Sequence, residues 1–243
     1  GTILSIDPSI NAGTAGVQHF FSLLYDGVKF ERAVSEGGLF STYINLFGYP
    51  FQNSYEPLLP ENLEQPVMRL PIEDNQAWSY TGGPHGGWGS GSAWAALEFA
   101  PPGEALGCVP SDAWILAVAD GVIVRAGNGA VIQDLDNDGL EQTGWTVLYM
   151  HVDTRDRVRA GTFVQAGERI GHPSCEGGFS SGTHLHLARR YNGEWIPADQ
   201  DIPFNLDGWI TVGLGYEYDG FLVKDGRKVE AWDGRDAINE IIR

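Results

Sequence analysis

Two histidines stand two positions apart in the segment GTHLHLARR, residues 182–190. Leucines alternate with His184 and His186, and this period of two predicts a β-strand. On a strand, positions i and i+2 point to the same face, so both imidazoles face one region of space. One ring can then bind a metal while the other serves a bound water. The alternative is a pair of polar residues on the solvent face of an amphipathic strand.

Two further histidines and a carboxylate favour the metal interpretation. His151 ends the alternating segment GWTVLYMHV, where we expect it to share one strand face with Val147 and Tyr149. His85 lies in the Gly-rich loop GGPHGGWGSGS. Glu98 interrupts the apolar run WAALEFA, and a buried carboxylate needs a cation or hydrogen-bond donors. Grouping His85, Glu98 and one histidine of the HxH pair around Zn²⁺ predicts a hydrolytic site with an open position for water.

The order of these segments resembles the lysostaphin-type (M23) zinc metallopeptidases. GGPH is followed thirteen residues after its histidine by a carboxylate, and then by AVADGVIV, LYMHV and GTHLH. The resemblance covers roughly residues 77–200. The thirteen-residue interval resembles the β-lytic branch of the family rather than the branch with a short HxxxD motif.

The resemblance implies a role for each of the five side chains. His85, Glu98 and His186 would ligate Zn²⁺, while His184 and His151 would flank the zinc-bound water as general base and hydrogen-bond donors. The implied activity is a zinc-dependent metalloendopeptidase. Its substrate would be a peptidoglycan cross-bridge or stem peptide, or another Gly-rich peptide.

One residue departs from the family pattern, which has Asp where this chain has Glu98. The extra methylene moves the carboxylate by roughly a bond length, whereas the Zn–O distance stays at about 2.0–2.2 Å. Either the backbone recedes there, or the metal site is altered or weakened. The departure leaves a second hypothesis, a non-catalytic or weakened relative acting as a cell-wall binding or regulatory module. A third is a carbohydrate-binding or structural β-protein whose histidines are dispersed.

A second acidic cluster lies in DLDNDGLEQ, residues 134–142. Asp134, Asp136 and Asp138, followed by glycine, match the opening of a calcium loop. The twelfth position of such a loop is Trp145 here, where a bidentate Glu belongs. The alternatives are a Ca²⁺ site and a solvated acidic hairpin tip.

Each of the remaining candidate residues also has a purely structural interpretation. Cys108 and Cys175 lie in Gly/Pro/Ser-rich loops and predict one disulfide, with two buried thiols as the alternative. His172 precedes a proline and is expected to be a turn residue, and His19 is expected to be structural or exposed. Three aromatic residues lie near the proposed site in the sequence, namely Trp88, Trp94 and Tyr191. They either form the walls of a substrate groove or are ordinary core and rim residues.

Bulk properties narrow the partners and the compartment. The net charge of −17 disfavours binding to nucleic acid or to anionic membranes. The sequence contains no apolar run of about 18 residues and no visible signal peptide, so we expect no membrane insertion. A disulfide would imply an oxidising compartment. We expect a monomer that is secreted, periplasmic or at the cell surface.

The pattern of short apolar runs and Gly turns predicts a mainly β, antiparallel fold. The family resemblance implies that this fold is of the lysostaphin-like (duplicated hybrid motif) type. We divide the chain into an N-terminal, partly helical segment 1–76, a catalytic domain 77–203 and a C-terminal β-hairpin extension 204–243. WILAVADGVIVRAG predicts a hairpin turning at AspGly, and YDGFLVKDGRKVEAW predicts another. The charged tail predicts a short helix.

Overall fold

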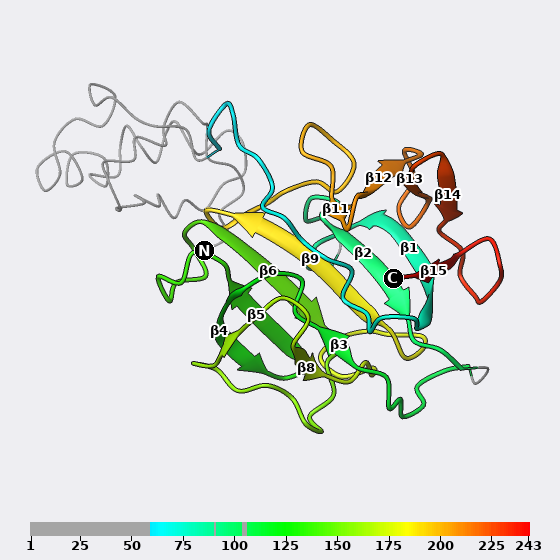
Figure 1. Cartoon of the computed structure of the whole chain (residues 1–243), viewed down its shortest axis with the longest axis horizontal. Helices are drawn as coiled ribbons and strands as arrows, with labels where there is room; N and C mark the ends of the chain where they lie inside the picture. The colour runs from blue at the N-terminus through cyan, green and yellow to red at the C-terminus, as the bar shows by residue number, and fades with distance from the viewer. Residues whose placement is uncertain (1–58, 90, 104–105) are drawn as a thin grey trace, which may run out of the picture. The chain divides into compact units, whose positions relative to one another are not determined.

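The computed structural model describes residues 59–243 apart from residue 90 and residues 104–105 (Figure 1). The described residues form strands, turns and extended segments, without an α-helix. Leu63–Arg243 form one compact unit. The helical content predicted near the N-terminus, and His19, lie outside the described residues. The domain boundaries at residues 76 and 203 stay predictions.

The largest sheet contains nine strands that pair antiparallel in the order β15-β1-β2-β9-β6-β5-β4-β7, with β10 pairing to β9. Its strands are β1 (Ala77–His85), β2 (Ala96–Ala100), β4 (Gly121–Gly127), β5 (Ala130–Asp134), β6 (Trp145–Met150), β7 (Phe163–Val164), β9 (Leu185–Tyr191), β10 (Glu194–Trp195) and β15 (Glu240–Ile242). A four-stranded sheet contains β11 (Asn205–Leu206), β12 (Trp209–Gly213), β13 (Gly220–Lys224) and β14 (Arg227–Glu230). The short strands β3 (Ile115–Leu116) and β8 (Arg169–Gly171) form a separate pair. The mainly antiparallel β fold predicted from the alternation is therefore confirmed.

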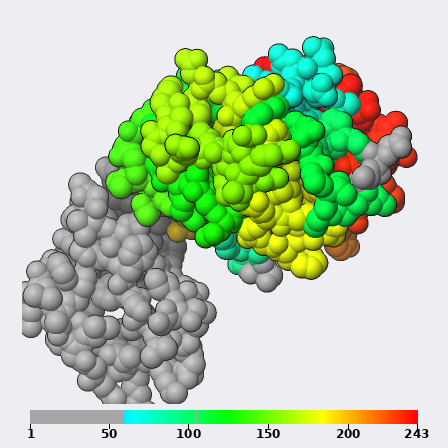
Figure 2. Space-filling view, turned by 90° about the horizontal axis from the view of Figure 1, so that it is seen from below, coloured from blue at the N-terminus to red at the C-terminus, as the bar shows by residue number. Residues whose placement is uncertain are grey.

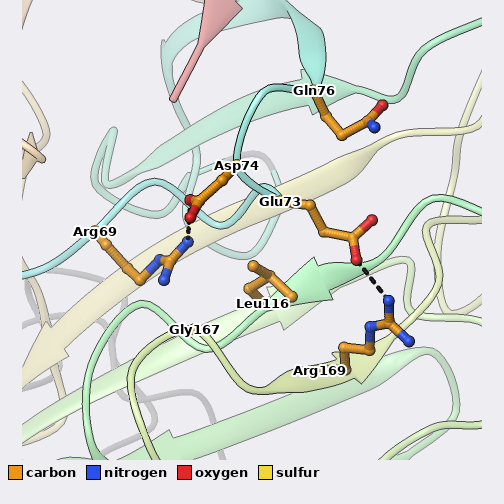
Figure 3. Close-up of a pocket in the computed structure, with 7 residues that line it drawn as sticks. All are labelled: Arg69, Glu73, Asp74, Gln76, Leu116, Gly167 and Arg169. Carbon is orange, nitrogen blue, oxygen red and sulfur yellow. Dashed lines mark hydrogen bonds and ion pairs between the residues drawn. The ribbon is translucent and has the colours of Figure 1, made fainter.

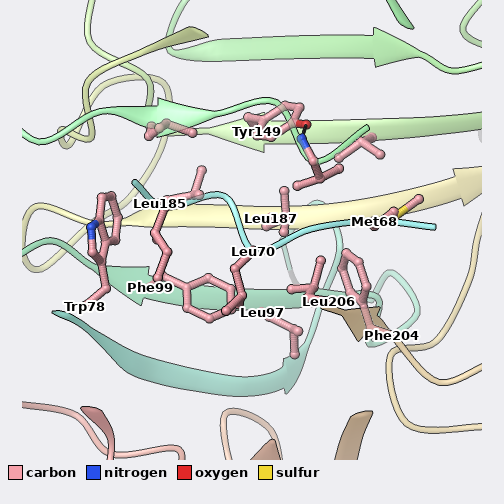
Figure 4. Close-up of a cluster of buried hydrophobic side chains, with 14 of the residues drawn as sticks. Met68, Leu70, Trp78, Leu97, Phe99, Tyr149, Leu185, Leu187, Phe204 and Leu206 are labelled. Carbon is pink, nitrogen blue, oxygen red and sulfur yellow. Dashed lines mark hydrogen bonds between the residues drawn. The ribbon is translucent and has the colours of Figure 1, made fainter. Parts of the chain in front are cut away.

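One face of the large sheet carries the main hydrophobic core. Alternate residues of β2 and β9 point into it, among them Phe99 and Leu187, because successive side chains of a strand lie on opposite faces. The extended segment that contains Met68 and Leu70 also packs there (Figure 4). This burial holds the central strands β2, β9 and β6 together.

The opposite face of the same strands carries the candidate site. Small and aliphatic side chains form its apolar part, namely Ala96, Ala130, Ile132, Leu148, Met150 and Ala188. The register pairs Glu98 with His186 between β2 and β9, and His186 with Met150 between β9 and β6. Because both faces of these strands are buried, a slip of one residue would exchange the core for the site.

The hairpin predicted for residues 114–127 is wrong. β3 pairs with β8, whereas β4 pairs with β5 and β7. Gly121, which the sequence pattern placed in a turn, lies inside the sheet beside β5. A Cβ built on it would lie 2.3 Å from the backbone oxygen of Asp134, so the glycine permits close strand approach rather than a turn.

Of the two predictions for the C-terminal region, one is confirmed and one is wrong. The hairpin around AspGly is confirmed, because β13 pairs with β14 and both Asp225 and Gly226 have positive φ, at 48° and 79°. The helix predicted for the charged tail is wrong, since Glu240–Ile242 forms β15 on the edge of β1. Ile241 is fully buried there, so tertiary packing and the ladder with β1 outweigh local helical preference.

Candidate metal centre

Three of the predicted metal-binding side chains converge from neighbouring strands. His85 ends β1, Glu98 lies in β2 and His186 lies in β9. The Nε2 atom of His85 is 3.0 Å from Nδ1 of His186 and 3.3 Å from Oε1 of Glu98. The third side of the triangle, from Nδ1 of His186 to Oε1 of Glu98, is 3.8 Å. The register of β1, β2 and β9 therefore brings together one donor atom from each residue.

The chemistry of this donor set fits Zn²⁺. Tetrahedral coordination with bonds of about 2.0–2.2 Å gives donor–donor separations of about 3.3–3.6 Å, and the three measured sides lie around that range. The other ring nitrogens are engaged, because Nδ1 of His85 lies 2.8 Å from the carbonyl of Gly83 and Nε2 of His186 lies 3.1 Å from the carbonyl of Gly87. Donation to these carbonyls selects the tautomers that present a lone pair to the centre.

Two more histidines border the same centre. The rings of His151 and His184 lie with centroids 4.4 Å apart, and those of His151 and His186 lie 6.3 Å apart. Nε2 of His184 is buried and makes no hydrogen bond among the described residues, although it lies 3.3 Å from Oε1 of Glu98. All five side chains predicted for the metal and its water are thus brought together. Their dispersal, which the carbohydrate-binding hypothesis required, is not observed.

His151 reaches the centre by a route that its strand pattern does not predict. Alternation along β6 assigned it to the face of Val147 and Tyr149, which lies on the core side. That assignment is wrong, because β6 ends at Met150 and His151 has a φ of 65°. The left-handed backbone turns the ring toward His184 instead. A non-glycine residue in this region is uncommon, and such strain is concentrated at functional sites.

Burial and mutual contact shift the acid–base properties of the metal-free site. Burial alone raises the pKa of Glu98, but contacts with His184, His186 and His85 outweigh it and hold the pKa well below its usual value. Burial and the neighbouring charge of His184 lower the pKa of His151 to about 4. Burial opposes protonation of His184 too, yet its contact with Glu98 raises its pKa. The two water-flanking candidates therefore differ in proton affinity.

A loop held by a disulfide positions these two histidines. Cys108 and Cys175 are joined in a disulfide, so the structure contains no free thiol at these positions. The N–H of Ser174 donates to the carbonyl of His151 at 2.7 Å, and the N–H of His184 donates to the carbonyl of Ser174 at 3.3 Å. Figure 2 shows the yellow residues that lead into β9 beside green residues that follow β2.

Further carbonyl contacts orient the rings. Nδ1 of His151 lies 2.8 Å from the carbonyl of Glu176, and Nδ1 of His184 lies 2.8 Å from the carbonyl of Gly182. Both carbonyls belong to the loop that follows the disulfide. Donation from Nδ1 leaves Nε2 of each ring as the nitrogen that can accept a proton.

Sequence reasoning missed Tyr218. Its ring stacks on His85 with centroids 4.2 Å apart and an interplanar angle of 19°. The N–H of Gly83 donates to the carbonyl of Tyr218, and the N–H of Tyr218 donates to the carbonyl of Pro84, so the β12–β13 loop is bound to the end of β1. The only local signal was the aromatic segment GYEYDG, which does not indicate that it lies beside a residue more than a hundred positions earlier.

Other candidates do not contact the centre. His172 lies against Ala113 and stacks on Trp114. Tyr191 packs edge-on against Trp145 at the opposite end of β9 from His186. Trp88, in the turn after β1, is half exposed, and Trp94, before β2, is partly buried. A groove-lining role for these aromatic residues stays a prediction.

The acidic loop of Asp134, Asp136 and Asp138 brings its carboxylates together. They accept hydrogen bonds from the loop itself, since Asp134 binds the N–H groups of Asp136 and Gly139, and Asp138 binds the N–H of Leu140. These contacts are those of a self-satisfied turn. The predicted Ca²⁺ site has no further support.

A surface cavity of about 400 Å³ lies elsewhere on the molecule (Figure 3). Its walls contain two ion pairs, Arg169 with Glu73 at 2.8 Å and Arg69 with Asp74 at 3.3 Å. None of the five centre residues lines it. The chemistry of the metal centre is therefore separate from this cavity.

Comparisons with known proteins agree with this geometry. Residues 105–198 match the model of peptidase family M23, a range that includes His151, His184 and His186 and begins after Glu98. Protease LasA from Pseudomonas aeruginosa is 26% identical over 213 residues in strain PAO1, covering 78% of this chain and 47% of the relative. LasA from strain UCBPP-PA14 is 27% identical over 214 residues with the same coverage. This chain spans about half the length of these curated relatives.

A solved structure extends the similarity to the fold. The M23 metalloprotease pseudoalterin, described as coming from the deep sea, superposes with a TM-score of 0.59 at 26% sequence identity. The match covers 74% of this chain and 99% of pseudoalterin. The histidine and glutamate cluster therefore lies in a chain that matches peptidase family M23 over residues 105–198 and is similar to LasA in sequence and to pseudoalterin in fold.

Proposed function

We propose that this chain is a zinc-dependent metalloendopeptidase that hydrolyses peptide bonds in peptidoglycan cross-bridges or stem peptides. The observation that carries the proposal is the cluster of His85, Glu98 and His186, with His184 3.3 Å from the carboxylate and His151 against the ring of His184. Each of the four rings has one nitrogen against a backbone carbonyl, which leaves the other for the centre. The match of residues 105–198 to peptidase family M23 supports the same reaction class.

The roles follow from position. His85, Glu98 and His186 would hold Zn²⁺, which when bound lowers the pKa of a coordinated water and polarises the scissile carbonyl. His184 has a buried, unbonded Nε2 beside this donor set and is placed to accept the proton that the water loses. The ring of His151 packs against the ring of His184. When His151 is protonated, it would donate a hydrogen bond to the reacting oxygen.

The compartment and the partner are part of the proposal. The Cys108–Cys175 disulfide supports an oxidising environment, which agrees with a secreted, periplasmic or cell-surface protein. Among the described residues, no helix is long and apolar enough to cross a membrane. The substrate would be a Gly-rich or stem peptide of the cell wall, bound by a monomer.

The test is metal analysis of the purified chain combined with hydrolysis of a pentaglycine-containing peptide and of isolated peptidoglycan. We expect one Zn²⁺ per chain and cleavage that is abolished by chelation and restored by zinc. A chain that is metal-free, inactive and not reconstituted by zinc would contradict the proposal. Zinc binding without hydrolysis of either substrate would favour the alternative, a non-catalytic relative that binds wall peptides.

A further inference from the structure

Gly82 lies directly opposite Glu98 in the β1–β2 pairing. The register shifts on both sides of this pair, between Tyr80 and Gly82 and again between Gly82 and His85. β1 therefore contains one extra residue on each side, and such bulges re-aim side chains near functional sites. The two bulges place Gly82 opposite Glu98.

The side chain of Glu98 lies against the space that a side chain at Gly82 would occupy. A Cβ built on Gly82 would lie 3.0 Å from Cβ of Glu98 and also 3.0 Å from its Oε2. Cross-strand Cβ atoms are ordinarily about 4.5–5.5 Å apart. Both the first carbon of the glutamate side chain and its carboxylate would therefore be in tight contact with an added Cβ.

The empty volume at Gly82 explains how the longer carboxylate fits. A glutamate has one methylene more than an aspartate and needs more room between the strands. Its Oε1 lies 3.3 Å from Nε2 of His85 and 3.8 Å from Nδ1 of His186, while its Oε2 lies beside the space that glycine leaves empty.

The contact is specific to side chains and does not arise from backbone strain. Gly82 does not have the left-handed backbone that favours glycine, so alanine is compatible with its conformation. The third close atom is Cδ1 of Tyr218 at 3.2 Å, on a half-exposed ring. At the next residue, Gly83, an added Cβ would meet the backbone of Asp219 at 2.6 Å, which is a packing requirement of a different kind.

We propose that Gly82 is a positioning residue matched to Glu98, and that its missing side chain lets the longer carboxylate join His85 and His186 as a zinc ligand. The inference rests on the proposed zinc site. This role of Gly82 explains how the chain tolerates Glu98 where the family pattern has Asp. The partner strand makes room for the longer side chain, so the glutamate does not weaken the centre. Replacing Glu98 with aspartate in this chain would then lower zinc affinity.

The test is a double-mutant cycle in which Zn²⁺ affinity is measured by competition with a chelating dye. We expect Gly82→Ala to weaken zinc binding about 10–100-fold, the range found when a partner that orients a ligand is lost. Glu98→Asp also weakens binding. In the Glu98→Asp background, we expect Gly82→Ala to cost less than about threefold, because the shorter side chain leaves room for the added methyl.

Gly127→Ala is the matched control, since this glycine also lies in a strand and a Cβ there meets nothing within 4 Å. Unfolding midpoints of the metal-free variants separate lost folding from lost zinc binding, and the double variant reports the coupling if Gly82→Ala alone folds poorly. Equal costs of Gly82→Ala in both backgrounds, or no cost in the natural one, would overturn the inference while the zinc site stands. A wild-type chain that binds no Zn²⁺ would overturn both.

Discussion

The candidate metal centre has two halves that are held in different ways. His85, Glu98 and His186 lie on three neighbouring strands, and the register of β1, β2 and β9 determines their separations. His151 and His184 lie just outside the ends of β6 and β9, where a loop and a disulfide place them. Metal affinity should therefore follow the sheet, whereas turnover should also follow the loop.

Removing a ligand from the strand half should produce the largest effect. We expect His186→Ala to lower zinc affinity by more than about 100-fold, beyond the range for residues that only orient ligands, and to reduce peptide hydrolysis below detection. Metal content after dialysis and hydrolysis of a Gly-rich peptide measure the two effects. Stoichiometric zinc in this variant would show that the strand triad is not the metal site.

Removing a histidine from the loop half should separate binding from turnover. We expect His184→Ala to retain zinc within about tenfold while turnover falls about 10²–10⁴-fold, the usual contribution of a general base. The same metal analysis and hydrolysis assay apply. If His184→Ala lost zinc as completely as His186→Ala, the division of the centre into two halves would be wrong.

Opening the disulfide should affect the loop half alone. We expect the double variant Cys108→Ala/Cys175→Ala to bind zinc like the wild type but to turn over about 10–100-fold more slowly, because small displacements of catalytic groups are costly. Its free energy of unfolding should fall by about 2–4 kcal/mol. Urea denaturation, zinc titration and hydrolysis distinguish these effects, and an unchanged turnover would contradict a positioning role for the loop.

The acid sensitivity of the metal-free protein should report on His151. Its folded pKa of about 4 lies below the unfolded value of about 6.5, so folding favours the neutral ring. Its contribution is fully present above about pH 6.5 and is lost as the pH falls toward 4, by on the order of 1–3 kcal/mol.

The measurement is the urea midpoint of the chelated protein at pH 7 and pH 4.5. We expect His151→Asn to lose less stability between these pH values than the wild type does. His172→Asn is the matched control, because that buried histidine lies outside the centre. Equal losses in the wild type and His151→Asn would show that His151 does not contribute to the acid sensitivity.

The sequence predicted the strand half better than the loop half for a physical reason. Alternation is a local property of a strand, so it correctly indicated that His186 and Ala188 of β9 lie on the face opposite Leu185 and Leu187. It failed at His151, because one left-handed residue reverses the face and the sequence pattern contains no sign of that φ. It also failed at Tyr218, whose contact with His85 depends on how a distant loop packs.

By itself the sequence determined the antiparallel β character, the five side chains of the centre and the family they resemble, because residue types, spacing and alternation are local. Only the tertiary structure decided which strands pair, as with β3 and β8, and how the glutamate reaches the centre. The second point depends on Gly82, which lies sixteen positions before Glu98 in the sequence. The pairing of β1 with β2, with a bulge on each side, brings the two residues opposite each other. Long-range register and the space left by a missing side chain are properties of the folded chain.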